Sequence, residues 1–539
     1  MNIKKYIFGI LIPLSLPSIA TSNELLGLYP ADSVELTKNL PNQHTSKQVL
    51  WYFKDQIIAV PKSAAYVTQI TQKPAMQDLA NLNADTLPPL IWVVANNLIP
   101  HATLTTNETY IQGDRTDDTK ADEDRSASFS IANKIPTNQS FWNDSTYTFF
   151  KKRPVRLSGN DTNRGFIVST AWPLDFKLDL NAKTKPIGNN EQLKSLVQEK
   201  NGGAKSAFES RLIWGNASQA HGKAVLGVML NGAQGDDDEA HGGHFAIATG
   251  RVGTDGDMSQ WLVNNYYNLA SNSEKGIIAA PTPLDKYMAD VNSGQSYYRP
   301  SVMLVAVFKQ DRVPAQFQAA TNRVYQHFYR NDFVYDHSRN NCAGISIDTL
   351  RNLGWNIPER GVESHLKAIG AYFLISAKER SLTKGRAIYD YLNTEKTRLY
   401  PAQTFDATGE DLLNRLLNPA SKTLQNGALE KQIKEDIEAI YFVRIPQIPS
   451  SRAFGRAPVY GFDEYMSRVP ADPKDWKTAP ATPNPFPEAL KDGLALKLEK
   501  PSLVPLPVAI VFTLLLYGLV ALFRKIWHLK TVKYSNNIK

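Results

Sequence analysis

The segment Asn340–Leu350, NNCAGISIDTL, contains the only cysteine among the 539 residues of the chain. Apolar side chains repeat with helical spacing after Cys342, and Asn340 or Asn341 is a good N-cap, so the segment predicts a helix whose first turn carries the thiol. The unpaired backbone N–H groups and the positive end of the helix dipole favour thiolate there, and we expect the pKa of Cys342 to lie below its usual value of about 8.5. The alternative is a buried structural cysteine, the commoner state of a free thiol.

Two apolar segments predict export and a membrane anchor. Residues 1–20 join two lysines to an apolar run and a small-residue cleavage site, which is the pattern of a secretory signal peptide. Residues 503–523 carry no charge and would span about 31 Å as a helix, which suits a hydrocarbon core of roughly 30 Å. The basic tail, residues 524–539, is placed in the cytoplasm by the positive-inside rule. We therefore expect a single-pass protein of the inner (plasma) membrane whose body lies on the periplasmic or extracytoplasmic side.

The net charge of the body and the single cysteine exclude some classes of function and favour others. The formal net charge is +8, but two lysines of the signal segment and five basic residues of the tail supply seven of these charges. The body is therefore almost neutral, and we expect no nucleic-acid partner. A single cysteine cannot form an internal disulfide, and a thiol kept in an oxidising compartment favours a catalytic use.

Between the two ends we expect a β-rich accessory domain at residues 21–204 and a catalytic domain at residues 205–400. The accessory half contains five short runs of β-branched and aromatic residues that predict strands: Val49–Phe53, Gln56–Val60, Leu90–Val94, Thr146–Phe150 and Phe166–Thr170. In the catalytic half a helix should begin near Pro314. It should follow two strands of a hairpin and a third, apolar strand: His244–Gly250, Gln260–Tyr267 and Ser301–Phe308.

A helical extension and a proline-rich stalk are expected after residue 400. Residues 401–445 contain Leu429, Ile433, Ile437 and Ile440, which predict an amphipathic helix packed on the catalytic domain. Residues 446–502 are rich in proline, which favours an extended, semi-rigid stalk leading to the membrane. The alternative is that this segment wraps the body and is ordered.

A cysteine nucleophile needs a base. A thiol attacks an acyl carbon well only when a nearby imidazole accepts its proton. Of the nine histidines, His221, His241 and His244 lie at positions suited to this role. His244 stands at a glycine-to-strand junction, where a side chain is held rigidly at a sheet edge, and is the preferred base. His241 is the reserve.

A metal site is the competing interpretation of the same region. The run Asp236–Glu239, with His241 and His244, offers carboxylate and imidazole ligands for zinc or manganese. The two histidines are separated by glycines rather than sharing a helix face, and the chain has neither a His-Glu-x-x-His nor a paired-cysteine pattern. We therefore expect no metal and no cofactor.

Two short motifs carry a family resemblance. They are Gly-Gly-His-Phe at 242–245 and Asn-Cys-Ala-Gly at 341–344, with Tyr335 in the loop before the second. In this order the segment resembles the circularly permuted branch of the papain-like NlpC superfamily, which includes lecithin:retinol acyltransferases and bacterial periplasmic proteins. The resemblance implies an α+β fold, in which an antiparallel sheet packs on the cysteine-bearing helix.

The resemblance also implies the roles of the site residues. Cys342 would be the nucleophile and His244 the base, oriented by a polar residue on the next strand. That strand offers Asn264 or Asn265, and parity with His244 across the hairpin favours Asn264. The departures from the family pattern are the acidic run before residue 240 and the extra His241.

The expected function is that of a cysteine hydrolase or acyltransferase, exported and anchored in the membrane. It would act on an amide or ester bond through a thioester intermediate, and the resemblance leaves cell-wall peptides and lipid acyl chains open as substrates. The alternative from another class is a non-enzymatic envelope module that uses the same cleft for binding. A metal-dependent hydrolase is the third hypothesis.

Overall fold

The computed structural model describes most of the chain between residues 25 and 536. It leaves out 38–46, 54–55, 63–74, 77, 80–91, 96, 106–109, 116–125, 132–143, 164, 233–241, 268–270, 274–278, 292–298, 334, 338–339, 363, 418–426, 450–458, 469, 471, 476–480, 484 and 491–501. The expected signal peptide, the acidic run Asp236–Glu239 and His241 therefore lie outside the described residues.

An antiparallel sheet of seven strands forms the centre of the molecule. Its strands, in spatial order, are β11 (Glu209–Gly215), β18 (Ile437–Ile445), β17 (Ser301–Phe308), β12 (Ala224–Asn231), β13 (His244–Arg251), β14 (Leu262–Asn264) and β16 (Pro281–Pro283). The predicted hairpin is confirmed as β13 and β14, with Ile247 opposite Asn264, and β17 has the predicted bounds. The chain is thus a mixed α+β protein, as expected.

The two faces of the sheet bury alternate side chains of the same strands, as the period of two requires. In β12, Leu226 and Val228 pack in a core formed with the helices, whereas Val225 and Met229 pack in a second core formed with an N-terminal barrel. Because both faces are covered, β12 and β17 are buried along their whole length.

Helices cover one face. They contribute side chains to the first core and are α3 (Asn190–Gly202), α5 (Arg312–Tyr329), α6 (Cys342–Asn352), α10 (Pro401–Leu417) and α11 (Ala428–Asp436). Leu193 of α3 belongs to this core, so the core contains residues from both sides of the domain boundary expected at residue 204.

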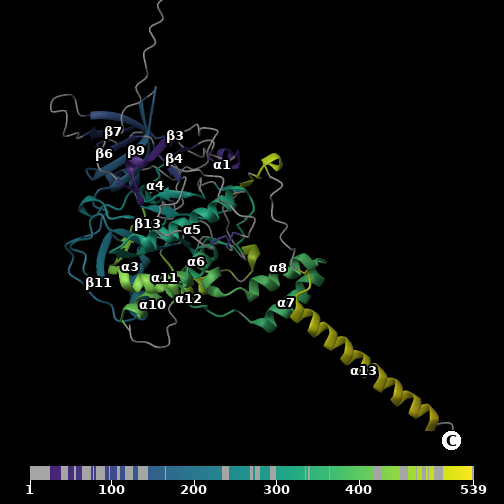
Figure 1. Ribbon diagram of the computed structural model, residues 1–539. Helices are drawn as coiled ribbons and strands as arrows, with labels where there is room; N and C mark the ends of the chain where they lie inside the picture. The colour runs from purple at the N-terminus through teal and green to yellow at the C-terminus, as the bar shows by residue number, and fades with distance from the viewer. Residues whose placement is uncertain are drawn as a thin grey trace, which may run out of the picture.

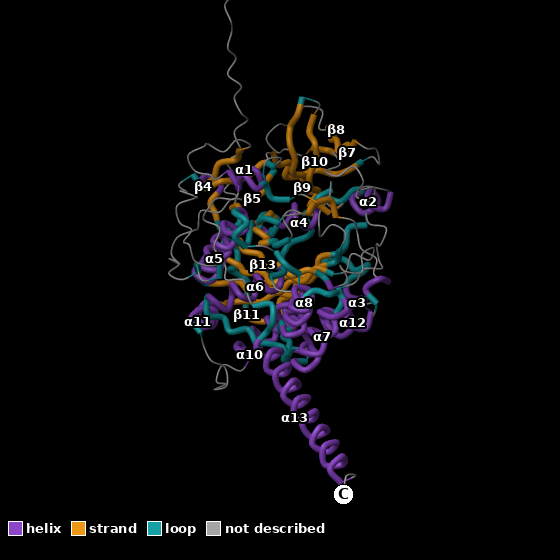
Figure 2. The backbone as a smooth tube through the Cα atoms, turned by 90° about the vertical axis from the view of Figure 1, so that its right-hand side faces the viewer, coloured by secondary structure: helices purple, strands orange, loops and turns teal. Residues whose placement is uncertain are grey.

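A closed barrel of five strands covers the other face. Its strands are β6 (Asn97–Leu104), β7 (Tyr110–Arg115), β8 (Ser126–Ile131), β9 (Pro154–Thr162) and β10 (Gly165–Pro173). Helix α4 (Leu284–Ala289) packs between barrel and sheet, because Leu284 and Met288 share the second core with barrel residues. The β-rich character expected for the N-terminal half is confirmed. Figure 2 shows the barrel at one end of the molecule.

Three of the five predicted N-terminal strands are confirmed and two are wrong. The confirmed ones fall in β4 (Ile57–Pro61), β5 (Trp92–Val94) and β10. Val49–Phe53 falls largely in the helix α1 (Lys47–Tyr52), and Thr146–Phe150 in the helix α2 (Asp144–Phe150). In α2 the buried residues Thr146 and Phe150 are four apart, which is a helical spacing that the abundance of β-forming residues concealed.

The helical extension expected at 401–445 is wrong in its last part. Helix α11 ends at Asp436, and Ile437–Ile445 forms β18 in the interior of the sheet. A strand that is buried on both faces does not alternate polar and apolar residues. The spacing of Ile433, Ile437 and Ile440 therefore looked like the continuation of a helical apolar stripe.

The described parts of 446–502 pack against the body, which supports the wrapping alternative over the stalk. Strand β19 (Ala481–Pro483) pairs with β15 (Ser271–Ser273), and helix α12 (Phe462–Arg468) precedes it. The ring of Phe486 lies 5.2 Å from that of Trp51.

Two helices, α7 (His365–Lys378) and α8 (Leu382–Asn393), form a hairpin at the end opposite the barrel. The long helix α13 (Leu506–Asn536) leaves the body beside this hairpin (Figure 1). Its segment Leu506–Lys530 is, among the described residues, the helix long and apolar enough to cross a membrane.

Candidate active site

Cys342 is the first residue of α6, as predicted, and Asn341 is the N-cap. The Asn341 side chain accepts a hydrogen bond from the Gly344 N–H at 2.9 Å and donates one to the Leu399 carbonyl at 2.8 Å. The cap satisfies one of the N–H groups that a helix start leaves unpaired. The first turn of α6 is therefore fixed, and the backbone around the thiol with it.

The thiol of Cys342 lies against the start of strand β13. The backbone N–H of Phe245 and the hydroxyl of Tyr335 both donate to the sulfur, and the N–H of Cys342 donates to the Tyr335 oxygen. The residue is only 4% exposed. Helix start, strand start and the loop that carries Tyr335 thus meet at the sulfur atom.

His244, the first residue of β13, immediately precedes the Phe245 amide that contacts the thiol. Its Nε2 lies 2.8 Å from Oδ1 of Asn265, just beyond the end of β14. An amide oxygen can only accept, so Nε2 carries the proton and Nδ1 is left as the basic nitrogen. No hydrogen bond among the described residues joins this ring to the thiol, and in substrate-free enzymes such bonds often form only when substrate binds.

Burial sets the charge state of both groups. It lowers the pKa of His244 to about 3, with help from the positive charge of Arg299 and against the hydrogen bond to Asn265. Burial also raises the pKa of the Cys342 thiol, against the Phe245 N–H, Tyr335 and Arg299. The expected lowering of the Cys342 pKa is therefore wrong, because desolvation outweighs the helix terminus. The resting pair is a neutral thiol and a neutral imidazole.

The asparagine hydrogen-bonded to His244 is Asn265 rather than the favoured Asn264. Asn264 donates to the Ile247 carbonyl at 3.0 Å and accepts from Gln318 at 3.0 Å, so it ties β13 and β14 to α5. Asn264 lies opposite Ile247 in the sheet, so both side chains are on the face that the helices cover. The parity argument for Asn264 is wrong, because the observed register pairs Asn264 with Ile247; continued by one residue, it puts Asn265 opposite Ala246, on the same side of the sheet as His244.

Two further residues near the thiol escaped the sequence argument. Arg299 is 4% exposed, and its charge acts on both Cys342 and His244. The signal was a basic residue two positions before the nearly all-apolar strand β17. His337, which was not among the histidines selected as candidate bases, acts on His244 through its charge, and its ring lies 5.1 Å from that of Tyr335.

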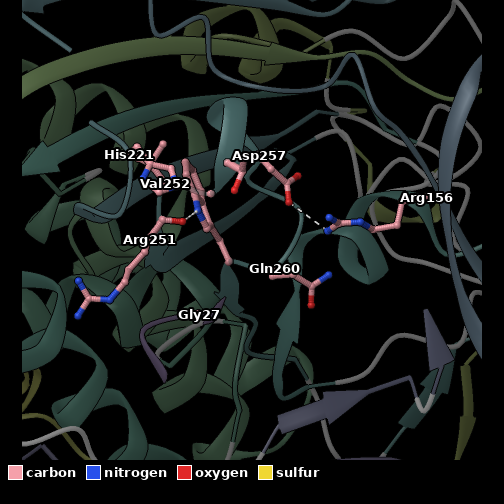
Figure 3. A pocket seen from close by; sticks show the side chains of 10 residues that line it. Gly27, Arg156, His221, Arg251, Val252, Asp257 and Gln260 are labelled. Atoms are coloured by element: carbon pink, nitrogen blue, oxygen red, sulfur yellow. Dashed lines mark hydrogen bonds and ion pairs between the residues drawn. The ribbon is translucent and has the colours of Figure 1, made fainter. Parts of the chain in front are cut away.

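His221 lies elsewhere. It lines a cavity of about 190 Å³ together with Arg156, Arg251 and Asp257, as Figure 3 shows. Arg251 is the last residue of β13 and is seven residues from His244, or about 23 Å along an extended strand. The structure thus places His221 at the far end of β13, whereas His244 stands one residue before the Phe245 amide that acts on the thiol.

Comparisons of the chain with models of protein families, with curated proteins and with solved structures found no match.

Proposed function

We propose that this chain is a membrane-anchored cysteine hydrolase or acyltransferase with a permuted papain-like catalytic domain. Cys342 is the nucleophile, His244 the general base and Asn265 the residue that orients the ring. The proposal is carried by the hydrogen bond between His244 Nε2 and Asn265 Oδ1, in a chain where the residue after His244, Phe245, gives its N–H to the Cys342 thiol.

The neutral resting state favours general-base chemistry over a preformed ion pair. Nδ1 of His244 accepts the thiol proton while the sulfur bonds to the acyl carbon of an amide or ester. The protonated ring then gives this proton to the leaving amine or alcohol, and a thioester on Cys342 remains. Water or an acceptor hydroxyl gives its proton to Nδ1, attacks the thioester and frees the sulfur, which takes the proton back.

The charge of Arg299 supports this sequence of steps. Its charge acts on both Cys342 and His244, and we assign it the stabilisation of the oxyanion that forms on the acyl oxygen. It also disfavours a standing imidazolium, which keeps His244 available as a base.

The second candidate is a binding module without turnover. The burial that raises the pKa of Cys342 and leaves it 4% exposed favours this alternative, because a buried thiol is usually inert. In such a module the His244–Asn265 pair would serve only to hold the ends of β13 and β14 together.

The place of action proposed is the outer side of the plasma membrane. Helix α13 would cross the bilayer once, with the basic residues after Phe523 in the cytoplasm and the body in the periplasm. Cell-wall peptides and lipid acyl chains both lie within reach of such a site.

The experiment compares the cell envelopes of strains that carry the wild-type chain, Cys342→Ala and Tyr389→Phe, a control change on α8. Mass spectrometry of peptides and lipids should find one bond-intact class accumulating only with Cys342→Ala. If the envelope is unchanged and the Cys342→Ala strain keeps full biological activity, the enzyme hypothesis is wrong and the binding module is favoured.

A further inference from the structure

Helix α7 exposes an apolar stripe. Leu366, Gly370, Leu374 and Ala377 follow one another at spacings of three or four residues, and all four are exposed. Leu366 is 81% exposed and Leu374 67%, and at the start of α8 Leu382 is 48% exposed. Three exposed leucines on one short hairpin are an unfavourable surface in water.

The stripe is continuous with the root of the apolar helix α13. The ring of Phe373 stacks on that of Phe512 with centroids 6.4 Å apart. The Tyr372 hydroxyl donates to the Leu503 carbonyl at 3.0 Å, and Arg386 donates to the Ser502 carbonyl. Figure 1 shows α7 and α8 where α13 leaves the body.

The contact with Phe512 fixes the depth of α7 relative to the bilayer. Phe512 comes six residues after Leu506, the first residue of α13, and therefore lies about 9 Å further along the helix axis. Helices that lie in the interface of a bilayer bury their apolar face by about 5–10 Å. If α13 crosses the bilayer from its first turn, α7 must lie at this depth as well.

The polar groups of the hairpin have the charge that such a position requires. Residues 365–393 contain two acidic and five basic residues: Glu379 and Asp390, against Lys367, Lys378, Arg380, Lys384 and Arg386. Basic side chains beside an apolar stripe are attracted by anionic lipid headgroups and can extend to reach them.

We propose that the α7–α8 hairpin is a membrane-interface element that binds the surface of an anionic bilayer beside α13. The inference rests on α13 crossing the membrane, as proposed above, and not on the chemistry of Cys342. It fixes the orientation of the body on the membrane, which one spanning helix alone would leave free to rotate.

The hairpin is also coupled to the helix that carries the thiol. Glu395, two residues after α8, forms an ion pair with Arg351 of α6. Helix α9 (Lys396–Leu399) follows, and its Leu399 carbonyl binds the N-cap Asn341. A hairpin held by lipid would therefore hold the Cys342 helix start at a constant height above the bilayer.

The test uses the full chain with Cys342→Ala, reconstituted in vesicles of phosphatidylcholine and phosphatidylglycerol. A single cysteine is placed at Leu374→Cys, at Leu516→Cys within α13, or at Asn163→Cys in the exposed β9–β10 turn at the barrel end, and is labelled with an environment-sensitive fluorophore. All three sites are exposed, so the label should not disturb folding. Lipids brominated near the headgroup quench a label at the depth expected for Leu374, and lipids brominated near the end of the acyl chain quench a label at Leu516, which lies about 15 Å along α13 from Leu506.

The labels at Leu374 and Leu516 should both shift their emission to the blue and lose intensity with brominated lipid. The label at Asn163 should do neither. If the Leu374 label behaves like that at Asn163 while the Leu516 label is quenched, α13 is inserted and the hairpin proposal is wrong. Cross-linking between copies at Leu374 with no quenching would assign the stripe to a second copy of the chain instead. An unquenched Leu516 label would overturn the anchor and the hairpin together.

Discussion

The ring of His244 and the side chain of Asn265 are joined by a hydrogen bond of 2.8 Å between Nε2 and Oδ1, where β13 begins and β14 has just ended. The bond fixes the proton on Nε2 and leaves Nδ1 to act as a base. Because Phe245, the next residue, donates its N–H to Cys342, the same strand start holds the base and contacts the nucleophile.

The two adjacent asparagines should therefore separate function from stability. Asn265→Ala should lower turnover by roughly ten- to a hundredfold through loss of ring orientation, with little change in substrate KM. Asn264→Ala leaves the Gln318 amide and the Ile247 carbonyl unpaired and should lower the free energy of unfolding by about 1–3 kcal/mol. Steady-state kinetics and denaturant unfolding of both variants measure this, and the opposite pattern would restore Asn264 to the orienting role.

His244 should make stability depend on pH. Between the unfolded pKa of 6.5 and the folded pKa of about 3, the unfolded chain binds a proton at His244 and the folded chain does not. The free energy of unfolding should therefore fall as pH is lowered through this range, by up to about 1.4 kcal/mol per pH unit from this group. Unfolding in detergent at pH 7 and pH 5 measures the slope, which His244→Gln should reduce and the control His221→Gln should not. A wild-type slope in His244→Gln would mean that the ring is not buried as described.

Cys342 should react slowly with alkylating agents in the absence of substrate. Burial raises its pKa, so at pH 6 the folded protein should be alkylated more slowly than a model thiol, and denaturation should remove the difference. The measurement is the rate of mass increase with iodoacetamide. Faster alkylation than the model thiol, lost in His244→Gln, would instead indicate a preformed thiolate–imidazolium pair.

Sidedness follows from the charges that flank α13. A reporter active only outside the cytoplasm should be silent when fused after Lys539 and active when fused near Lys491. The reverse result would place Cys342 in a reducing cytosol, where keeping a single thiol needs no catalytic explanation.

Local signals predicted much of this site. The N-cap at Asn341, the helix from Cys342 and the strand Ser301–Phe308 are determined by neighbours in sequence, and the structure has all three. The membership of β18 in the sheet was not predictable, because its partners Ser301–Phe308 and Glu209–Gly215 are more than a hundred residues away.

The pairing at the site needed tertiary information as well. The choice between Asn264 and Asn265 depends on the register between β13 and β14, because a shift of one residue exchanges the faces of the two asparagines, and the sequence of the connecting turn did not fix that register. The charge state of Cys342 was predicted from the helix terminus alone, whereas the decisive term is burial under the Tyr335 loop and β13. Arg299 could be noticed only once the start of β17 was known to lie beside β13 through β12.

The central claim is tested most directly by intact-protein mass spectrometry of the full chain after brief exposure to an activated acyl ester. Wild-type protein should gain one acyl group on Cys342 that hydroxylamine removes. Cys342→Ala should gain none, His244→Gln should acylate at least about a hundredfold more slowly, and His221→Gln should match the wild type. Acylation of His244→Gln at the wild-type rate, or no acylation of folded wild-type protein by any ester or amide donor, would contradict the account.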